Sequence, residues 1–525
     1  MKRLSFALLL LASLVTVASA SVADPVHVEQ GLVSGVTGKN PDVRVYRGIP
    51  YAAPPVGDLR WRAPQPPAAW QGVREAKEYS NECWQTPYPA AASIYQSKLG
   101  PLSEDCLYLN IWSSAKSAKN RLPVMFWIHG GGFTRGSGTG AAYDGEILAG
   151  KGVVVVTINY RLGAFGFFAH PALTVESGHH ASGNYGLMDQ IAALQWVKKN
   201  IAAFGGDPGR VTIFGESAGS WAVCALMASP TAKGLFQRAI GESGGSFSPM
   251  TSLADAEKAG ERVAASILSQ STAQDALKAL RAVSAEALLK ATDSETARAI
   301  VDGFVLPQSV SEIFAQGKQN DVPLLVGNNA DEGTALVPQA AAMKAAMFVG
   351  GVRTRYGPLA DQLLKVYPGD SDEQAVRSFY SAYRDQVFGW EMRTWARMQT
   401  KTGHHSVYRY YFSRVPPGPL SQRLGAFHAA EVAYVFGTFP WPFSWDDTDH
   451  KLSDVITGYW VNFATTGNPN GEGLPRWPEY SAQSDQSLEL GDKISVRSEI
   501  NKAGLDFFDS YYQSLKAPQP VAGGK

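Results

Sequence analysis

Two short stretches of this sequence combine a serine with the small residues that a catalytic turn requires. GESAG at 215–219 and GESGG at 241–245 both fit the pattern Gly-x-Ser-x-Gly. This pattern can hold a serine on a sharp turn between a strand and a helix, where its hydroxyl attacks a carbonyl once a base accepts the proton. Because the chain contains 52 glycines, a chance match is expected roughly 0.4 times. The surrounding residues must therefore decide between Ser217 and Ser243.

The elements around the two serines differ. Ser217 follows the strand-like VTIF and precedes SWAVCALMA, an apolar helical pattern without a breaker. Ser243 follows the short strand-like FQRAI, but two glycines and then Pro249 come next, and these residues disfavour a helix. The sequence predicts Ser217 as the nucleophile. Ser243 is expected in a turn at the end of the neighbouring strand, where it can still lie near the site.

A glycine loop offers hydrogen-bond donors for the oxyanion that such an attack creates. HGGGF at 129–133 follows an apolar strand pattern at 123–130. Glycines let a backbone approach a ligand closely and direct N–H groups toward it. The candidate donors are Gly130, Gly131 and Gly132, together with the N–H of Ala218, which follows the nucleophile.

A base must be found among nine histidines. The pairs 179–180 and 404–405 lie in polar stretches and are expected at the surface. A metal site there is conceivable, but no cluster of cysteines or carboxylates supports it. His129 belongs to the glycine loop. His428, in GAFHAAEVAYVFG, follows the last strand pattern and is the expected base.

The acid that orients this histidine is expected just past the strand pattern at 322–329. Asp331 and Glu332 lie there side by side, in NNADEGT. The order serine, acid, histidine is the one used by α/β-hydrolases. Spacing alone does not choose between the two carboxylates.

The elements that must position these residues alternate between strands and helices. The helix pattern GLMDQIAALQWVKKNIAAF, at 186–204, presents one apolar stripe. Strand, helix, strand at this spacing predicts a mostly parallel sheet flanked by helices. The helix-rich stretches 250–320 and 340–400 are expected to cover the end of the sheet that holds the site. The strand patterns lie at 123–130, 152–160, 210–216, 322–329 and 406–412.

The chain resembles the type-B carboxylesterases, the family that includes cholinesterases and bile-salt-activated lipases. The resemblance extends over about residues 30 to 480, and its blocks follow the family's order. It implies an α/β-hydrolase fold in a single catalytic domain at 21–525. The blocks read RGIPYAAPPVGDLRW, SEDCLYLNIW, HGGGF, NYRLGAFGF, GNYGLMDQIAALQWVKKNIAAFGGDP, FGESAG, NADEG, FHAAE and FATTGNPN.

The resemblance also implies the roles of the site residues. It favours Glu332 over Asp331 as the acid, and it requires no metal or cofactor. Its implied triad is Ser217, Glu332 and His428, with oxyanion donors at Gly131, Gly132 and Ala218.

Other positions gain implied roles in the same way. Ser243 and Glu431 match supporting polar residues near the histidine. Cys83 and Cys106 match a disulfide, beside a structural pair of Arg60 and Glu104. Where cholinesterases place aromatic residues after the acid, this chain has Ala335 and Leu336, so a preference for choline esters is not expected.

The N-terminus and the overall charge bear on location and partners. Lys2 and Arg3, an apolar run at 4–17 and Ala-Ser-Ala at 18–20 are typical of a signal peptide at 1–20. The apolar run is shorter than the about 18 residues of a membrane anchor, so an exported protein without an anchor is expected. The 47 basic residues balance 47 acidic ones, which disfavours a nucleic-acid partner.

Together these features predict a serine carboxylesterase that acts on a small-molecule ester through an acyl-enzyme. Two alternatives remain. The first is an interfacial lipase with the same chemistry. The second is a non-catalytic, cholinesterase-like binding module, which the presence of every triad element disfavours.

Overall fold

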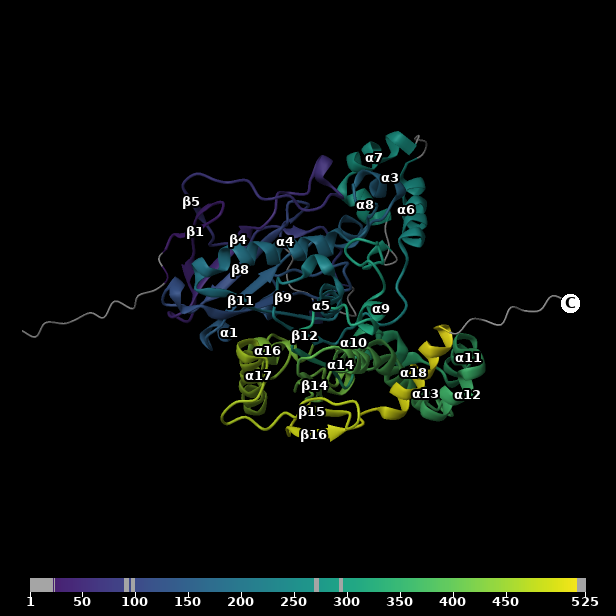
Figure 1. Cartoon of the computed structure of the whole chain (residues 1–525). Coiled ribbons are helices and arrows are strands. Elements are labelled where there is room, and N and C mark those ends of the chain that lie inside the picture. Colours follow the sequence, from purple (N-terminus) through teal and green to yellow (C-terminus); the bar gives the residue numbers. More distant parts are fainter. Residues whose placement is uncertain are drawn as a thin grey trace, which may run out of the picture.

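One large sheet runs through the protein, and the candidate residues lie beyond the carboxyl-terminal ends of its central strands (Figure 1). The computed structural model describes residues 22, 24–88, 94–95, 100–268, 273–291 and 296–516. The predicted signal peptide lies outside these residues. Within the described ranges, no helix is long and apolar enough to cross a membrane.

The sheet has eleven strands, and those in its middle are parallel. The antiparallel pairings lie toward its two edges. This arrangement confirms the predicted α/β fold with a mostly parallel sheet. In spatial order the strands are β16 (Ser495–Ser498), β15 (Gln486–Leu490), β14 (Val407–Phe412), β13 (Leu324–Asn329), β12 (Arg238–Glu242), β11 (Gly206–Glu216), β9 (Leu122–Ile128), β10 (Val154–Ile158), β8 (Tyr108–Ser113), β4 (Arg44–Pro50) and β3 (Val36–Thr37).

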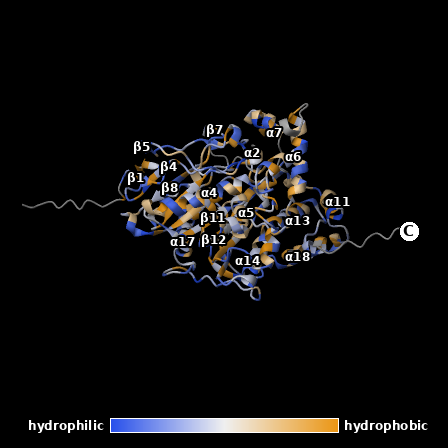
Figure 2. Cartoon of the chain, turned by 45° about the horizontal axis from the view of Figure 1, so that its top comes forward, coloured by the Kyte–Doolittle hydropathy of each residue, from blue (hydrophilic) through white to orange (hydrophobic). Residues whose placement is uncertain are grey.

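The two faces of the sheet belong to two buried hydrophobic clusters. Side chains alternate between the faces of a strand, and β9 shows the consequence. Phe126 joins the cluster that contains Leu194 of α4 (Tyr185–Asn200). Its neighbour Trp127 joins the cluster that contains Trp460 of α17 (Asp447–Thr466). Helices therefore cover both faces, and Figure 2 shows hydrophobic residues concentrated on the central strands and α5 (Ala218–Ala228).

The register of the central strands brings the two Gly-Glu-Ser stretches side by side. Glu216 at the end of β11 pairs with Glu242 at the end of β12. Glu242 in turn pairs with Gly327 of β13. Because parallel strands point in the same direction, the residues that follow all three strands meet at the carboxyl-terminal ends of these strands. The candidate site lies there.

Two groups of helices lie to one side of the sheet in Figure 1. One group fills part of the stretch between β12 and β13, and the other lies between β13 and β14. The first group is α6 (Leu253–Ile267), α7 (Ala273–Ala282), α8 (Ala285–Ala291) and α9 (Val310–Ala315), and the longer helices of the second are α11 (Ala345–Tyr356), α12 (Ala360–Val366), α13 (Asp372–Arg384) and α14 (Trp390–Thr402).

The disulfide that the resemblance implied is present between Cys83 and Cys106, with an S–S distance of 2.04 Å. Beside it, Nε of Arg60 donates to Oε2 of Glu104 at 2.7 Å. Arg60 also donates to the carbonyl of Val283 at 2.7 Å, which ties the N-terminal loops to the α7–α8 region. Cys224 is a free, buried thiol.

Candidate active site

Ser217 lies on a strained turn between β11 and α5. Its φ of 57° and ψ of −121° are rare for a residue with a side chain, and such a conformation costs of order 1–3 kcal/mol. Small neighbours allow the turn to close, because a Cβ on Gly219 would lie 1.9 Å from the carbonyl oxygen of Ile128. The N–H of Ser217 donates to the carbonyl of Glu242 at 2.9 Å. The local structure has the strand–turn–helix geometry of a nucleophile elbow.

His428 contacts a carboxylate through Nδ1. That nitrogen lies 2.6 Å from Oε2 of Glu332, whose side chain is fully buried. The other oxygen, Oε1, accepts hydrogen bonds from the Ser243 hydroxyl and the Asn329 N–H, each at 2.7 Å. Asp331, the other candidate acid, instead accepts from the N–H of Ala426 at 2.8 Å. The structure therefore brings Glu332, and not Asp331, to the imidazole.

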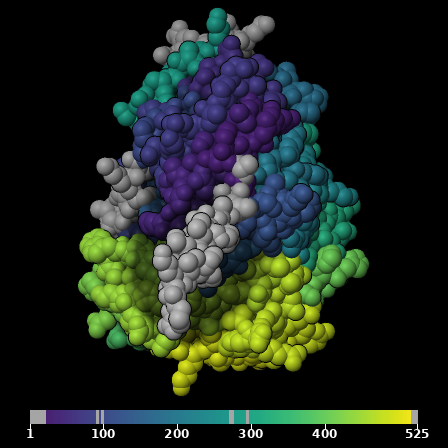
Figure 3. All heavy atoms as spheres, turned by 90° about the vertical axis from the view of Figure 1, so that its left-hand side faces the viewer, coloured from purple at the N-terminus to yellow at the C-terminus, as the bar shows by residue number. Residues whose placement is uncertain are grey.

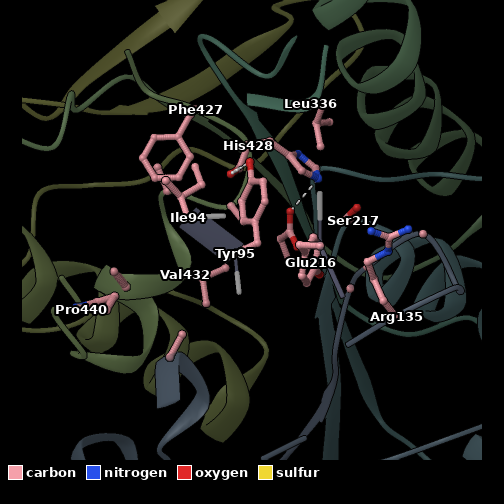
Figure 4. Close-up of a pocket in the computed structure, with 18 of the residues that line it drawn as sticks. Ile94, Tyr95, Arg135, Glu216, Ser217, Leu336, Phe427, His428, Val432 and Pro440 are labelled. Atoms are coloured by element: carbon pink, nitrogen blue, oxygen red, sulfur yellow. Dashed lines mark hydrogen bonds and ion pairs between the residues drawn. The ribbon is translucent and has the colours of Figure 1, made fainter. Parts of the chain in front are cut away.

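The second imidazole nitrogen faces another glutamate. Nε2 of His428 lies 2.9 Å from Oε1 of Glu216, as the dashed line in Figure 4 shows. Among the described residues, no hydrogen bond joins His428 to the hydroxyl of Ser217. Burial alone would lower the pKa of His428, but Glu216 and Glu332 together raise it well above its ordinary value of 6.5.

Sequence reasoning missed Glu216, although a signal was available. Both Gly-x-Ser-x-Gly stretches carry a glutamate directly before the serine, and the strand register pairs Glu216 with Glu242. An acidic residue that is repeated next to each candidate nucleophile is a candidate for a titratable group of the site. Glu242 itself lies deeper and accepts from the indole N–H of Trp460 at 2.8 Å.

Burial also sets the charge of the neighbouring carboxyls. It raises the pKa of Glu242 to about 8, and burial next to other carboxylates raises the pKa of Glu431 well above its ordinary value. For Glu216, burial raises the pKa against the lowering effect of His428. Asn329 donates its side-chain N–H to Glu431, whose other oxygen lies 3.5 Å from the Tyr410 hydroxyl. Burial thus favours the neutral, protonated form of both Glu242 and Glu431.

Ser243 also has a positive φ, 54°. It is fully buried, and its N–H donates to the carbonyl of Gly327 at 2.8 Å. The hydroxyl points to Glu332 and lies outside the residues that line the cavity described below. Ser243 is therefore placed to hold a carboxylate and not to meet a substrate.

The glycine loop presents backbone N–H groups beside Ser217. Gly131 and Gly132 have positive φ values, 106° and 65°. The carbonyl of Gly131 accepts from the Thr134 hydroxyl at 3.1 Å and from the Arg135 N–H at 3.2 Å. Within the described part of the chain, the N–H groups of Gly131 and Gly132 donate to no protein acceptor. Ala218 is the first residue of α5, so its N–H belongs to the unpaired donors of a helix start.

A cavity of about 420 Å³ opens in front of Ser217 and His428. Most of its wall is apolar or aromatic, and its residues come from distant parts of the sequence. Described residues within 88–143 and 427–445 supply much of this wall, and Figure 3 shows early (purple and blue) and late (green and yellow) parts of the chain meeting on one face. Leu336, four residues after Glu332, also lines the cavity. The aromatic lining consists of Tyr88, Tyr95, Tyr143, Trp221, Tyr383, Phe388, Phe427, Trp441, Phe443 and Trp445.

The remaining histidine candidates lie away from this cavity. His129 is buried and stacks on Tyr160, with ring centroids 4.4 Å apart. The ring of His179 stacks on Phe304, and His404 contacts Asp321 at 2.9 Å. Among the described residues, no group of three or more potential ligands could hold a metal ion.

The parallel sheet, the turn at Ser217 and the order of the strands define an α/β-hydrolase. The family model described as "Carboxylesterase family" matches residues 23–508. The chain belongs to this family, and it is a carboxylic ester hydrolase.

Known proteins are similar over most of the chain. Fumonisin B1 esterase of Sphingopyxis macrogoltabida is 38% identical and covers 87% of this chain and 85% of its own length. Para-nitrobenzyl esterase of Bacillus subtilis is also 38% identical, over 90% of this chain and 96% of the relative. A solved structure of a PNB esterase superposes with a TM-score of 0.79 at 35% identity, covering 92% of this chain and 99% of the other.

Proposed function

We propose that the protein is a serine carboxylesterase in which Ser217, His428 and Glu332 form the catalytic triad. The observation that carries the proposal is the 2.6 Å contact between Glu332 and His428, which lines the same cavity as Ser217. A carboxylate at Nδ1 holds the tautomer in which Nε2 is free to accept a proton. Glu332 is itself held by Ser243 and Asn329.

The reaction then follows from the positions of these groups. In its neutral form, His428 breaks its contact with Glu216 and accepts the proton of Ser217. The oxygen of Ser217 then forms a bond to the ester carbonyl carbon. The N–H groups of Gly131, Gly132 and Ala218 donate to the resulting oxyanion. The carbon–oxygen bond to the alcohol breaks as the alcohol takes the proton from His428. Water, deprotonated by His428, then attacks the acyl-enzyme carbonyl, and the bond to Ser217 breaks as the Ser217 oxygen takes the proton from His428 and the acid is released.

Hydrolysis of p-nitrophenyl esters from acetate to palmitate tests this proposal. We expect Ser217→Ala to lower kcat by about 10⁴-fold or more, since the triad acts as a unit. Ser243→Ala is the matched control, because the second serine sits in the same sequence pattern. Equal losses in the two variants, with both proteins folded, would count against Ser217 as the sole nucleophile.

One observation favours a second candidate, an interfacial lipase. Trp441 lines the cavity and yet is 90% exposed, and an exposed aromatic ring can insert into a lipid surface. A lipase would show a jump in rate when tributyrin exceeds its solubility. Saturation below that limit, with an optimum at short acyl chains, would leave the esterase as the better description.

We also propose that the chain is exported after cleavage of residues 1–20. The Cys83–Cys106 disulfide supports this, because disulfides persist in oxidising compartments. N-terminal sequencing of protein recovered from the periplasm or the medium should begin close to residue 21. A full-length protein retained in the cytoplasm would contradict export.

A further inference from the structure

Arg135 stands out within the mostly apolar wall of the cavity. Apart from His428, it is the one basic residue among the described residues that line this cavity. It follows the glycine loop, and in Figure 4 its guanidinium points toward the side of the cavity where Ser217 lies. Arg135 therefore places a positive charge in the wall of the cavity beside Ser217.

The protein offers the guanidinium only neutral partners. Nη1 donates to the carbonyl of Pro87 at 3.2 Å, and Nε to the hydroxyl of Thr134 at 3.3 Å. The group stacks on the ring of Tyr88, 5.2 Å from its centroid. In the part of the chain that the structure describes, no carboxylate forms an ion pair with Arg135. A guanidinium has five N–H donors, so several remain available.

Two buried arginines of this chain, in contrast, are paired with carboxylates. Arg161 pairs with Asp189 at 2.7 Å, and Arg393 pairs with Asp509 at 2.8 Å. These pairs follow the general rule that a buried charge is matched by an opposite one. Arg135 is half-buried and has no carboxylate partner among the described residues, and unlike the equally unpaired Arg47 it lines the cavity beside Ser217.

The backbone fixes where this charge lies. The N–H of Arg135 donates to the carbonyl of Gly131 at 3.2 Å. A Cβ on Gly131 would lie 2.2 Å from the Arg135 carbonyl oxygen and 3.1 Å from its Cγ. The stem of Arg135 therefore packs directly on the loop that carries the proposed oxyanion donors. A ligand group bound to the guanidinium would be held at a defined position relative to Ser217.

The neighbouring glutamates do not neutralise this charge. Glu216 is engaged with Nε2 of His428 at 2.9 Å. Glu242 accepts from Trp460, Glu431 from Asn329, and Glu332 contacts His428. Each of these carboxyls has another partner, and none of them pairs with Arg135 among the described residues.

We propose that Arg135 binds a carboxylate of the substrate, so that the preferred substrates are esters that retain one free carboxylate. An arginine and a carboxylate can form two parallel hydrogen bonds, which provide both affinity and orientation. Half-esters of dicarboxylic acids and acyl esters of hydroxy acids belong to this class. The inference rests on the proposed ester hydrolysis and adds the substrate class to it.

The test compares esters that are equal in shape and differ in charge. Monoethyl adipate is compared with ethyl isooctanoate, in which an isopropyl group replaces the carboxylate. On the alcohol side, ω-acetoxyhexanoate is compared with isooctyl acetate. Acid release gives kcat/KM for each ester. We expect the charged member of at least one pair to be favoured by about 10- to 100-fold, the range of a hydrogen bond to a charged group.

Variants connect the preference to Arg135. Arg135→Gln should lower the ratio of charged to neutral kcat/KM by about 10- to 100-fold, and Arg135→Lys should restore part of it. Arg47→Gln is the matched control. Arg47 also stacks on a tyrosine, Tyr79, at 5.1 Å and donates to a carbonyl, that of Lys77, at 3.2 Å, but it lies outside the cavity. This variant should keep the wild-type ratio.

Failure of this inference is distinct from failure of the proposed function. If wild type hydrolyses the neutral esters and favours neither charged partner, or if Arg135→Gln keeps the wild-type ratio, the role of Arg135 is refuted while ester hydrolysis stands. If no ester is hydrolysed, both proposals fail. Calorimetric binding of monoethyl adipate to Ser217→Ala provides a readout independent of turnover, and adding Arg135→Gln should weaken that binding by about 10-fold or more.

Discussion

His428 lies between two glutamates, and this position sets the pH range in which it can serve as a base. An imidazole that holds its proton cannot accept one from Ser217. Since Glu216 and Glu332 outweigh burial and raise its pKa, the acid limb of kcat/KM should lie above the ordinary histidine value near 6.5. A pH profile with a stable ester measures this limb. A limb at or below that value would show that the two carboxylates do not hold the proton.

Glu216→Gln should move the acid limb to lower pH. The substitution removes one of the two negative charges that raise the pKa of His428, so the neutral imidazole forms at lower pH. Glu431→Gln is the matched control, because burial and neighbouring carboxylates raise the pKa of Glu431 and so favour its neutral form. The acid limb of Glu431→Gln should move much less than that of Glu216→Gln. Identical limbs in wild type and Glu216→Gln would contradict the interaction at Nε2.

Ser243→Ala should affect stability more than chemistry. The variant removes the hydrogen bond from Ser243 to the buried carboxylate of Glu332. Hydrogen bonds to charged groups contribute about 1.5–3 kcal/mol, so the free energy of unfolding should fall by about that amount. Urea unfolding measures this loss. An activity as low as that of Ser217→Ala would instead assign Ser243 a direct part in the reaction.

At the scale of single residues, the sequence predicts those candidate site residues that lie within recognisable motifs. Ser217 and His428 are predicted from motif and order, and Glu332 needs the family resemblance to separate it from Asp331. The repeated glutamate before each serine was a signal for Glu216, but the contacts of Glu216 and Arg135 could not be predicted, because they depend on what the side chains face. Glu216 turns toward His428, which is distant in sequence, and Arg135 is distinguished by the partners that it lacks.

At the scale of elements, the turn at Ser217 depends on the close contact between α5 and β9. A Cβ on Gly219 would lie 1.9 Å from the backbone oxygen of Ile128, which no side-chain adjustment can relieve. Gly219→Ala should therefore lower the free energy of unfolding by about 3 kcal/mol or more and also lower activity. Denaturant unfolding with an activity assay checks both.

Gly350→Ala provides the matched control for this substitution. Gly350 also lies inside a helix, α11, but nothing lies within 4 Å of an added Cβ. Alanine is favoured over glycine in helices by about 1 kcal/mol, so this variant should be slightly more stable than wild type. A loss in Gly350→Ala equal to that in Gly219→Ala would show that the contact with Ile128 is not the cause.

The elements themselves were largely predictable from periodicity. Each of the five predicted strands overlaps an observed one, and the helix expected at 186–204 corresponds to α4 at Tyr185–Asn200. The register between β11 and β12 could not be predicted, since it depends on pairing across the sheet. That register aligns Glu216 with Glu242 and so decides which carboxylates gather behind the nucleophile.

At the scale of the whole molecule, the disulfide constrains the N-terminal loops near the cavity. Cys83 and Cys106 are separated by 23 residues, and closing a loop of this length contributes about 3 kcal/mol in the chain-entropy model. The double variant Cys83→Ser, Cys106→Ser should lose about that much stability in urea. The same stability with and without the bond would contradict a structural role.

The cavity is a property of the complete chain and was not predictable in detail. Its wall combines Tyr88 from the N-terminal loops, Tyr383 from α13 and Trp445 from the loop before α17. Sequence spacing does not determine which aromatic side chains meet when segments so far apart assemble. We propose that residues 21–525 form one domain. A single cooperative transition in calorimetry is expected, and two separate transitions would contradict it.

The most direct test of the catalytic assignment is covalent labelling with diethyl p-nitrophenyl phosphate, followed by peptide mapping. This reagent transfers a phosphoryl group to an activated serine and releases one equivalent of p-nitrophenol. The account predicts a single modified residue, Ser217, with loss of activity in proportion to labelling. Modification of Ser243 in its place, or complete inactivation without a label on Ser217, would contradict it.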